Sequence, residues 1–203
     1  MDTKKIFQKF CFGFKIEKIV FSILLIFGVA LGSICINKIS NASMKEINSL
    51  FFLDLNYTSN FNIHNLMYSF GMSSIFIVVM ILMSLSVFGI IGIFLLIFLK
   101  GFGIGLILGS LYITHSLKGI IFGIIIILPG AFFSSMILIF LASESLKLAI
   151  KFSKKLLPNP GETYMWNELV NYTKKAGISV VFIILSSFLD FGLSCLFSKF
   201  FNF

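Results

Sequence analysis

Asp190 is the acidic side chain whose place in the sequence could support chemistry inside a membrane. It stands in the apolar run Ile178–Phe197, within the stretch SSFLDFGLS. A carboxylate there can relay protons or bind a cation, and an ionisable residue in a membrane segment is a functional-site hypothesis by default. No second acid or base in another apolar run offers a partner at mid-depth. Two interpretations of Asp190 therefore stay open: transport chemistry, or a role in structure or assembly, with the carboxyl group protonated or hydrogen-bonded to a serine such as Ser186 or Ser187.

Motifs for catalysis and for metal binding are missing from the sequence. It has no GxSxG, HExxH or Walker A motif, and its eight acidic residues form no cluster that could hold catalytic metal ions. The three cysteines, Cys11, Cys35 and Cys195, lack ligand spacing. We predict that the chain is not an enzyme and carries no cofactor or metal. All sixteen basic residues are lysines, and the lack of arginine argues against nucleic acid as a partner.

Glycines recur every four residues in KGFGIGLILGS, at Gly101, Gly105 and Gly109, and Gly119 and Gly123 repeat this spacing. Residues four apart share one helix face, and small residues there let two membrane helices pack closely. We expect this face to pack the predicted spans 101–117 and 119–142 against each other or against the span 70–99. An interface with another protein or a second copy of the chain stays open, as does a substrate path.

Composition sets the class of the protein. Of the 203 residues, 58% are hydrophobic and only 12% are charged, with a mean hydropathy of +1.05. Soluble domains are near 45–50% apolar, so this chain has too few charges to cover a water-exposed surface. The composition predicts an all-α polytopic membrane protein with about five transmembrane helices, for which membrane lipids are a natural partner.

The apolar segments define the predicted spans within a single transmembrane domain, residues 19–203. Lys100 is expected in a tight turn between the second and third spans. The third is the shortest, so a re-entrant segment is an alternative. Pro129 and Gly130 should kink the fourth span. The predicted spans are 19–36, 70–99, 101–117, 119–142 and 178–197.

Lysine placement predicts the orientation. Residues 1–18 form a basic amphipathic segment suited to an anionic membrane surface, and we expect the first span to be uncleaved. With the N-terminus inside, an outer loop covers 37–65 and a cytoplasmic loop covers 143–177. Twelve of the sixteen lysines then lie inside and four outside. We predict a cytoplasmic N-terminus and an external C-terminus.

The order of these parts resembles the stage II sporulation protein M family of integral membrane proteins. The resemblance covers roughly residues 75 to 200 and rests on the region from Lys100 to Gly105 and on the Pro129-Gly130 region. Many relatives carry a P-H-G-x-x-E pattern. Here Gly130 follows Pro129 directly, and serines stand near the acidic position, at Ser134 and Ser135.

The resemblance implies a scaffold without catalysis. Members of this family take part in forespore engulfment in endospore-forming bacteria, where they gather peptidoglycan-degrading enzymes at the septal membrane. It therefore implies peptidoglycan hydrolases as partners and the bacterial cell membrane, at the sporulation septum, as the location. The competing hypothesis from the residues is a small transporter or permease subunit with Asp190 in the pathway.

Overall fold

The computed structural model describes residues 16–36, 63–86, 88–155 and 165–197, and in this part of the chain all regular structure is helical. This confirms the all-α class. The elements are α2 (Ile16–Cys35), α4 (Ile63–Ser84), α5 (Gly89–Phe122), the π-helical turn η2 (Gly123–Ile127), α6 (Leu128–Lys155) and α7 (Met165–Phe197).

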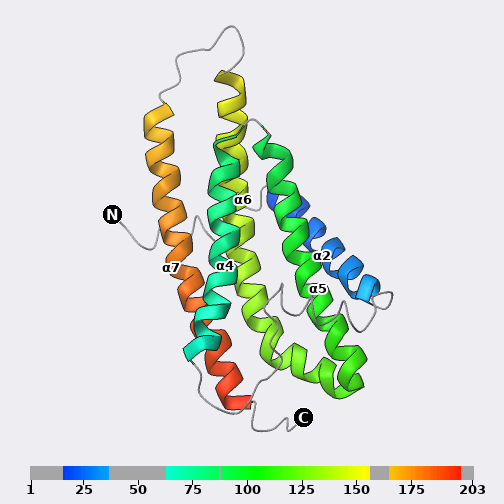
Figure 1. Cartoon of the computed structure of the whole chain (residues 1–203). Helices are drawn as coiled ribbons and strands as arrows, with labels where there is room; N and C mark the ends of the chain where they lie inside the picture. Colours follow the sequence, from blue (N-terminus) through cyan, green and yellow to red (C-terminus); the bar gives the residue numbers. More distant parts are fainter. Residues whose placement is uncertain (1–15, 37–62, 87, 156–164, 198–203) are drawn as a thin grey trace.

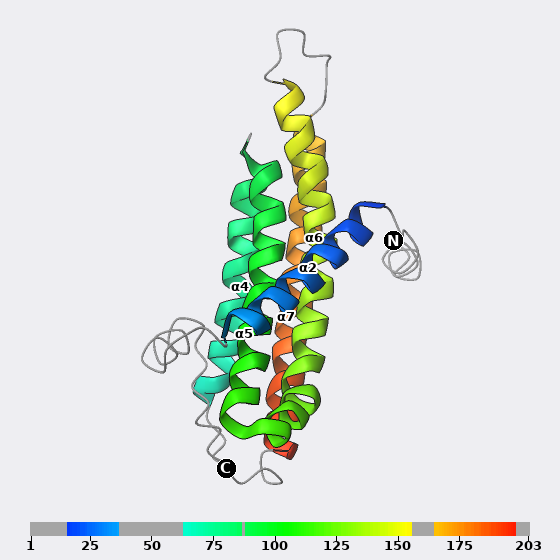
Figure 2. The same cartoon turned by 90° about the vertical axis from the view of Figure 1, so that its right-hand side faces the viewer.

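Four helices run lengthwise beside one another, and a fifth crosses them. In Figure 1, α4 and α6 run upward and α5 and α7 run downward. Helix α2 lies obliquely across α5, as Figure 2 shows after a quarter turn. Because successive helices reverse direction, the upper end of the bundle carries the α4–α5 turn, and the lower end carries the chain between α5 and α6.

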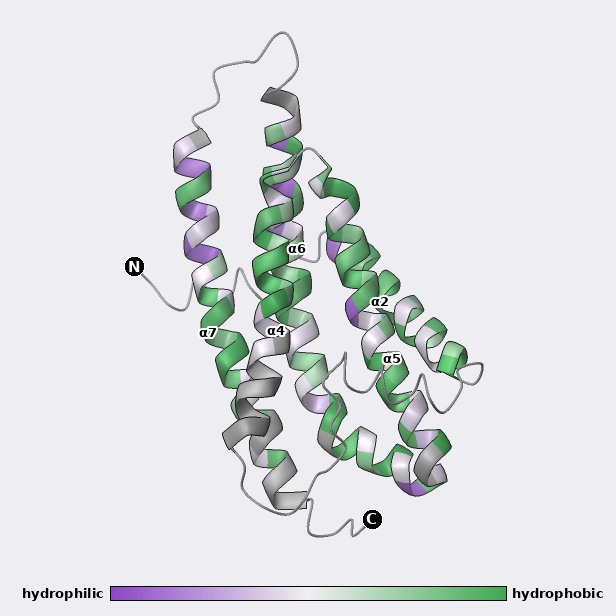
Figure 3. Cartoon of the chain, viewed as in Figure 1, coloured by the Kyte–Doolittle hydropathy of each residue, from purple (hydrophilic) through white to green (hydrophobic). Residues whose placement is uncertain are grey.

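The helices are long and apolar enough for a membrane. Four stretches meet that condition by length and composition, namely Ile16–Cys35, Gly89–Ile113, Leu128–Ser153 and Trp166–Leu189. The apolar part of α4, Ser73–Ser84, is shorter. Figure 3 shows apolar residues along most of the bundle, with hydrophilic residues gathered toward the upper ends of α6 and α7. The chain is a multi-pass membrane protein, and a count of five crossings requires α4 to cross as well.

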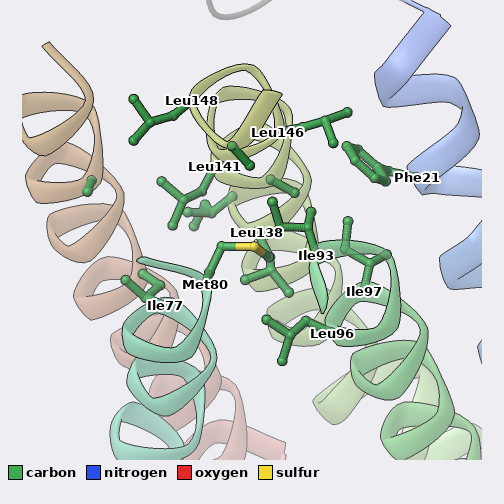
Figure 4. Packing of buried hydrophobic residues seen from close by; sticks show 14 of the residues in the cluster. Phe21, Ile77, Met80, Ile93, Leu96, Ile97, Leu138, Leu141, Leu146 and Leu148 are labelled. Atoms are coloured by element: carbon green, nitrogen blue, oxygen red, sulfur yellow. The ribbon is translucent and has the colours of Figure 1, made fainter. Parts of the chain in front are cut away.

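A core of aliphatic side chains joins the helices in the upper half. Figure 4 shows Met80 of α4, Ile93 and Ile97 of α5, and Leu138 and Leu141 of α6 converging there. All five are at most 2% exposed. Close packing of this kind supplies much of the attraction between helices in lipid, where burial of apolar surface adds little.

The boundary predicted at Lys100 is wrong. The chain turns between Ser84 and Gly89 instead, where the Gly89 amide donates to the Ser86 carbonyl at 3.0 Å. A Cβ atom on Gly89 would overlap the Met83 carbonyl, so this turn needs glycine. The predicted span 70–99 is therefore two helices, and Lys100 lies inside α5.

The lower reversal also differs from the prediction. Helix α5 continues to Phe122, with a sharp kink at Ser116, whose φ of 52° and ψ of −134° are non-helical. Leu111 and Phe122 pack against each other across this kink in a small second core. The expected span 119–142 is wrong at its start, because the upright helix α6 begins only at Leu128.

Pro129 stands where a helix irregularity was expected. The turn η2 ends at Ile127, and the Leu128 amide donates to the Gly123 carbonyl, five residues back. Proline has no amide hydrogen to continue the α-helical pattern, and π-type turns are a recognised cause of helix bends. Pro129 and Gly130 therefore lie in the first turn of α6, directly after the π-turn.

The predicted loop 143–177 is helical over most of its length, because α6 continues to Lys155 and α7 begins at Met165. Ion pairs between α6 and α7, described below, join these less apolar ends of the two helices. Of the predicted outer loop 37–65, the last three residues belong to α4, and 37–62 lie outside the described residues. The N-terminal segment 1–18 is described only from Ile16 onward.

Candidate functional site

The glycine face of α5 is a helix-packing surface, and its partner is α2. A Cβ atom on Gly101 would overlap the Leu25 carbonyl oxygen, and one on Gly105 would overlap that of Val29. A Cβ on Gly109 would lie 2.5 Å from Cγ2 of Ile36. The backbones of the two helices therefore touch. The prediction that these three glycines pack against the second span (70–99) or the fourth span (119–142) is therefore wrong.

Helix α2 contributes glycines of its own, which the sequence interpretation missed. Gly28 and Gly32 are both buried and also four residues apart. A Cβ on Gly28 would lie 2.6 Å from the Phe98 carbonyl oxygen, and one on Gly32 would overlap that of Phe102. The spacing in FGVALGS is the signal that could have revealed this face. We call the five residues Gly28, Gly32, Gly101, Gly105 and Gly109 the glycine interface.

The remaining two predicted glycines lie at the lower end. Gly119 is buried. A Cβ on Gly123 would lie 2.9 Å from Cδ2 of Leu108 and 3.4 Å from Cδ1 of Leu111. Gly123 thus lets η2 approach α5, as expected for packing between the third and fourth predicted spans.

Lys100 is a charged side chain in the interior of an apolar helix. It lies near the middle of the stretch Gly89–Ile113, and its Nζ lies 5.1 Å from the centre of the Phe76 ring of α4. A cation over an aromatic face is stabilised electrostatically, and an ionisable residue in such a stretch is a functional-site hypothesis by default. The sequence interpretation missed this position because it placed Lys100 in a turn.

Asp190 lies in α7, one turn after Ser186, as the sequence indicates. Its side chain is outside what the structure describes, so its two interpretations stay open. The hydroxyl of Ser186 donates to the Gly130 carbonyl of α6 at 3.2 Å, and that of Ser187 donates to the Ile183 carbonyl at 3.0 Å. Both serines are already used in hydrogen bonds within the helix bundle.

Glu144 joins α6 to α7 at the upper end. One carboxylate oxygen accepts a hydrogen bond from Lys147 at 2.6 Å, and the other pairs with Lys175 of α7. The Glu144 side chain is 18% exposed. A second pair, Lys151–Glu168, links the same helices but is far more exposed, at 48% and 46%. These contacts explain why both helices continue through the predicted loop.

A buried hydroxyl pair reinforces this junction. The hydroxyls of Ser145 in α6 and Tyr172 in α7 are 2.8 Å apart and buried. Hydroxyl pairs between helices satisfy polar groups that membrane hydrocarbon cannot solvate. Among the described residues no group of three or more His, Cys, Asp or Glu could hold a metal ion. The polar groups of this junction thus connect α6 and α7.

Comparison with known proteins gave no match to a family model, a curated protein or a solved structure. The resemblance to the stage II sporulation protein M family therefore remains a prediction from the motifs quoted above.

Proposed function

We propose that the chain is a non-catalytic membrane scaffold of bacterial endospore formation. In this proposal it gathers peptidoglycan-degrading enzymes at the septal membrane during forespore engulfment. The observation that supports a scaffold most is the placement of α2. Backbone contacts at the glycine interface hold one face on α5, while Ile23, Ile26 and Phe27 are 62%, 65% and 56% exposed.

A helix held in this way suits recruitment within the bilayer. In the apolar stretch of α2, 17% of the residues are buried inside the bundle, and exposed side chains such as Ile23 and Ile26 are open to lipid or to another membrane protein. The glycine interface brings the backbones of α2 and α5 into contact, and we expect such close packing to hold the outward face of α2 in one orientation. Fixed geometry is what a platform for several partners requires.

Site-specific photo-crosslinking in native membranes tests the proposal. A photoreactive residue replaces Ile26 of α2 in a tagged protein, and Val181 of α7, which is also 65% exposed, serves as the matched control. During sporulation we expect peptidoglycan hydrolases, or their membrane anchors, to be captured from Ile26 and not from Val181. Capture of lipid alone at Ile26 would contradict recruitment through α2.

A transporter or permease subunit is the second candidate function, and the position of Lys100 favours it. Lys100 is a second charged residue within an apolar stretch, Gly89–Ile113 of α5, in addition to Asp190 in α7. In proteoliposomes under a membrane potential, a proton-coupled transporter should take up protons, and Asp190→Asn should abolish that uptake. A scaffold should show no uptake with either protein.

A further inference from the structure

Two lysines, Lys18 of α2 and Lys147 of α6, lie near the upper end of α6. The Nζ atom of Lys18, in the first turn of α2, lies 5.3 Å from the centre of the Phe140 ring of α6. Glu144 follows Phe140 by one helical turn and accepts a hydrogen bond from Lys147 at 2.6 Å. The residues that these two lysines contact, Phe140 and Glu144, are thus about one helical turn apart on α6.

This face of α6 changes from apolar to charged within a single turn. Phe133, Met136, Phe140, Glu144 and Lys147 are spaced by three or four residues and so share one side of the helix. Phe133 and Met136 are 48% and 54% exposed. An exposed apolar stripe that ends in charged side chains marks the level at which the helix leaves the hydrocarbon.

We propose that Lys18 and Lys147 bind the headgroup phosphate of an anionic phospholipid, with its acyl chains lying along Met136 and Phe133. The ligand class follows from the two parts of the site, cationic groups at one level and exposed apolar side chains directly below it. Basic sites between transmembrane helices on the cytoplasmic side bind such headgroups. The inference does not depend on the scaffold function.

The local charge balance supports an anion. Glu144 is shared by Lys147 and Lys175, so one glutamate faces two lysines. Counted as formal charges, the three lysines Lys18, Lys147 and Lys175 and the two acids Glu17 and Glu144 keep one net positive charge. The exposed Lys174 adds a second at the same end of α7.

Lipid titration of the purified full-length protein in detergent tests this site. Phosphatidylglycerol should bind, as counted by native mass spectrometry, and should raise the unfolding temperature more than phosphatidylcholine does. The double variant Lys18→Gln, Lys147→Gln should bind phosphatidylglycerol about tenfold more weakly. Lys174→Gln, which removes the same charge from an exposed position of α7, serves as the matched control and should stay within about twofold of the unmodified protein.

Three results would overturn the proposal. One is unchanged phosphatidylglycerol binding in the double variant, and another is an equal response to phosphatidylcholine. The third is stabilisation by inorganic phosphate to the same extent, which would make the site one for a soluble anion. Should the double variant fail to fold, Lys18→Gln alone, which breaks no ion pair among the described residues, must show part of the same loss, and Lys18→Arg must restore binding.

Discussion

At the scale of single residues, Gly105 shows why glycine is required at the contact between α5 and α2. Its hydrogen atom is the only substituent that fits against the Val29 carbonyl oxygen. We predict that Gly105→Ala forces the two backbones apart and lowers the free energy of unfolding by about 2 kcal/mol. Thermal unfolding in detergent measures the change.

Gly177 of α7 supplies the matched control for Gly105. A Cβ atom placed there meets no other heavy atom within 4 Å. Gly177→Ala should therefore raise the free energy of unfolding by about 0.5 kcal/mol, because alanine loses less backbone entropy in a helix. Equal destabilisation by the two substitutions would show that the glycine interface is not a tight contact.

Ser116 carries the positive φ found among the non-glycine residues that the structure describes, with φ 52°. Side chains rarely occupy this region, and the cost of doing so is about 1–3 kcal/mol. Ser116→Gly removes that cost while adding entropy to the unfolded chain. We therefore predict that it raises the free energy of unfolding by about 1 kcal/mol, as measured by thermal unfolding. Ser116→Ala keeps the strain and should give no gain; a gain equal to that of glycine would refute the explanation.

At the scale of elements, the α6–α7 junction depends on Glu144 more than on the exposed pair Lys151–Glu168. Because Glu144 is 18% exposed and bonds two lysines, Glu144→Gln leaves both without their charged partner. We predict a loss of about 1–2 kcal/mol. Glu168→Gln removes the exposed pair with Lys151 and should change stability by less than about 0.5 kcal/mol. The reverse order in chemical denaturation would contradict this account of the junction.

Element boundaries show how far the sequence could be interpreted. The first span was placed within three residues of α2, because its apolar run ends in polar residues on both sides. The α4–α5 turn was missed because Leu85 and Phe88 are apolar and hide it within a continuous run. A lysine usually ends a span, so the sequence predicts a turn at Lys100, whereas this residue lies within α5 with its ammonium group over the Phe76 ring of α4.

The candidate site was predictable in part for similar reasons. The four-residue spacing of glycines in α5 indicates a packing face from sequence alone. Its partner α2 follows only from the fold, although Gly28 and Gly32 show the same spacing. The junction of Glu144 with Lys175 joins residues 31 apart in sequence, a pairing that no local pattern predicts.

At the scale of the whole molecule, the direction of each helix predicts on which side of the membrane a turn lies. In a cysteine-free protein, Ser86→Cys in the α4–α5 turn should react with an impermeant maleimide from the cytoplasmic side. Lys118→Cys, which follows the kink at Ser116, should react from the outside, because α5 lies between them. Labelling of both positions from one side would contradict a membrane-spanning α5.

The central claim, a scaffold that gathers cell-wall hydrolases, is tested most directly by a cross-linked pull-down of the tagged protein from native membranes during sporulation. An unrelated tagged multi-pass protein from the same membranes is the control. The scaffold account predicts that peptidoglycan-degrading enzymes are enriched over that control. Enrichment of an ATPase or permease without any hydrolase, or of no partner at all, would contradict it.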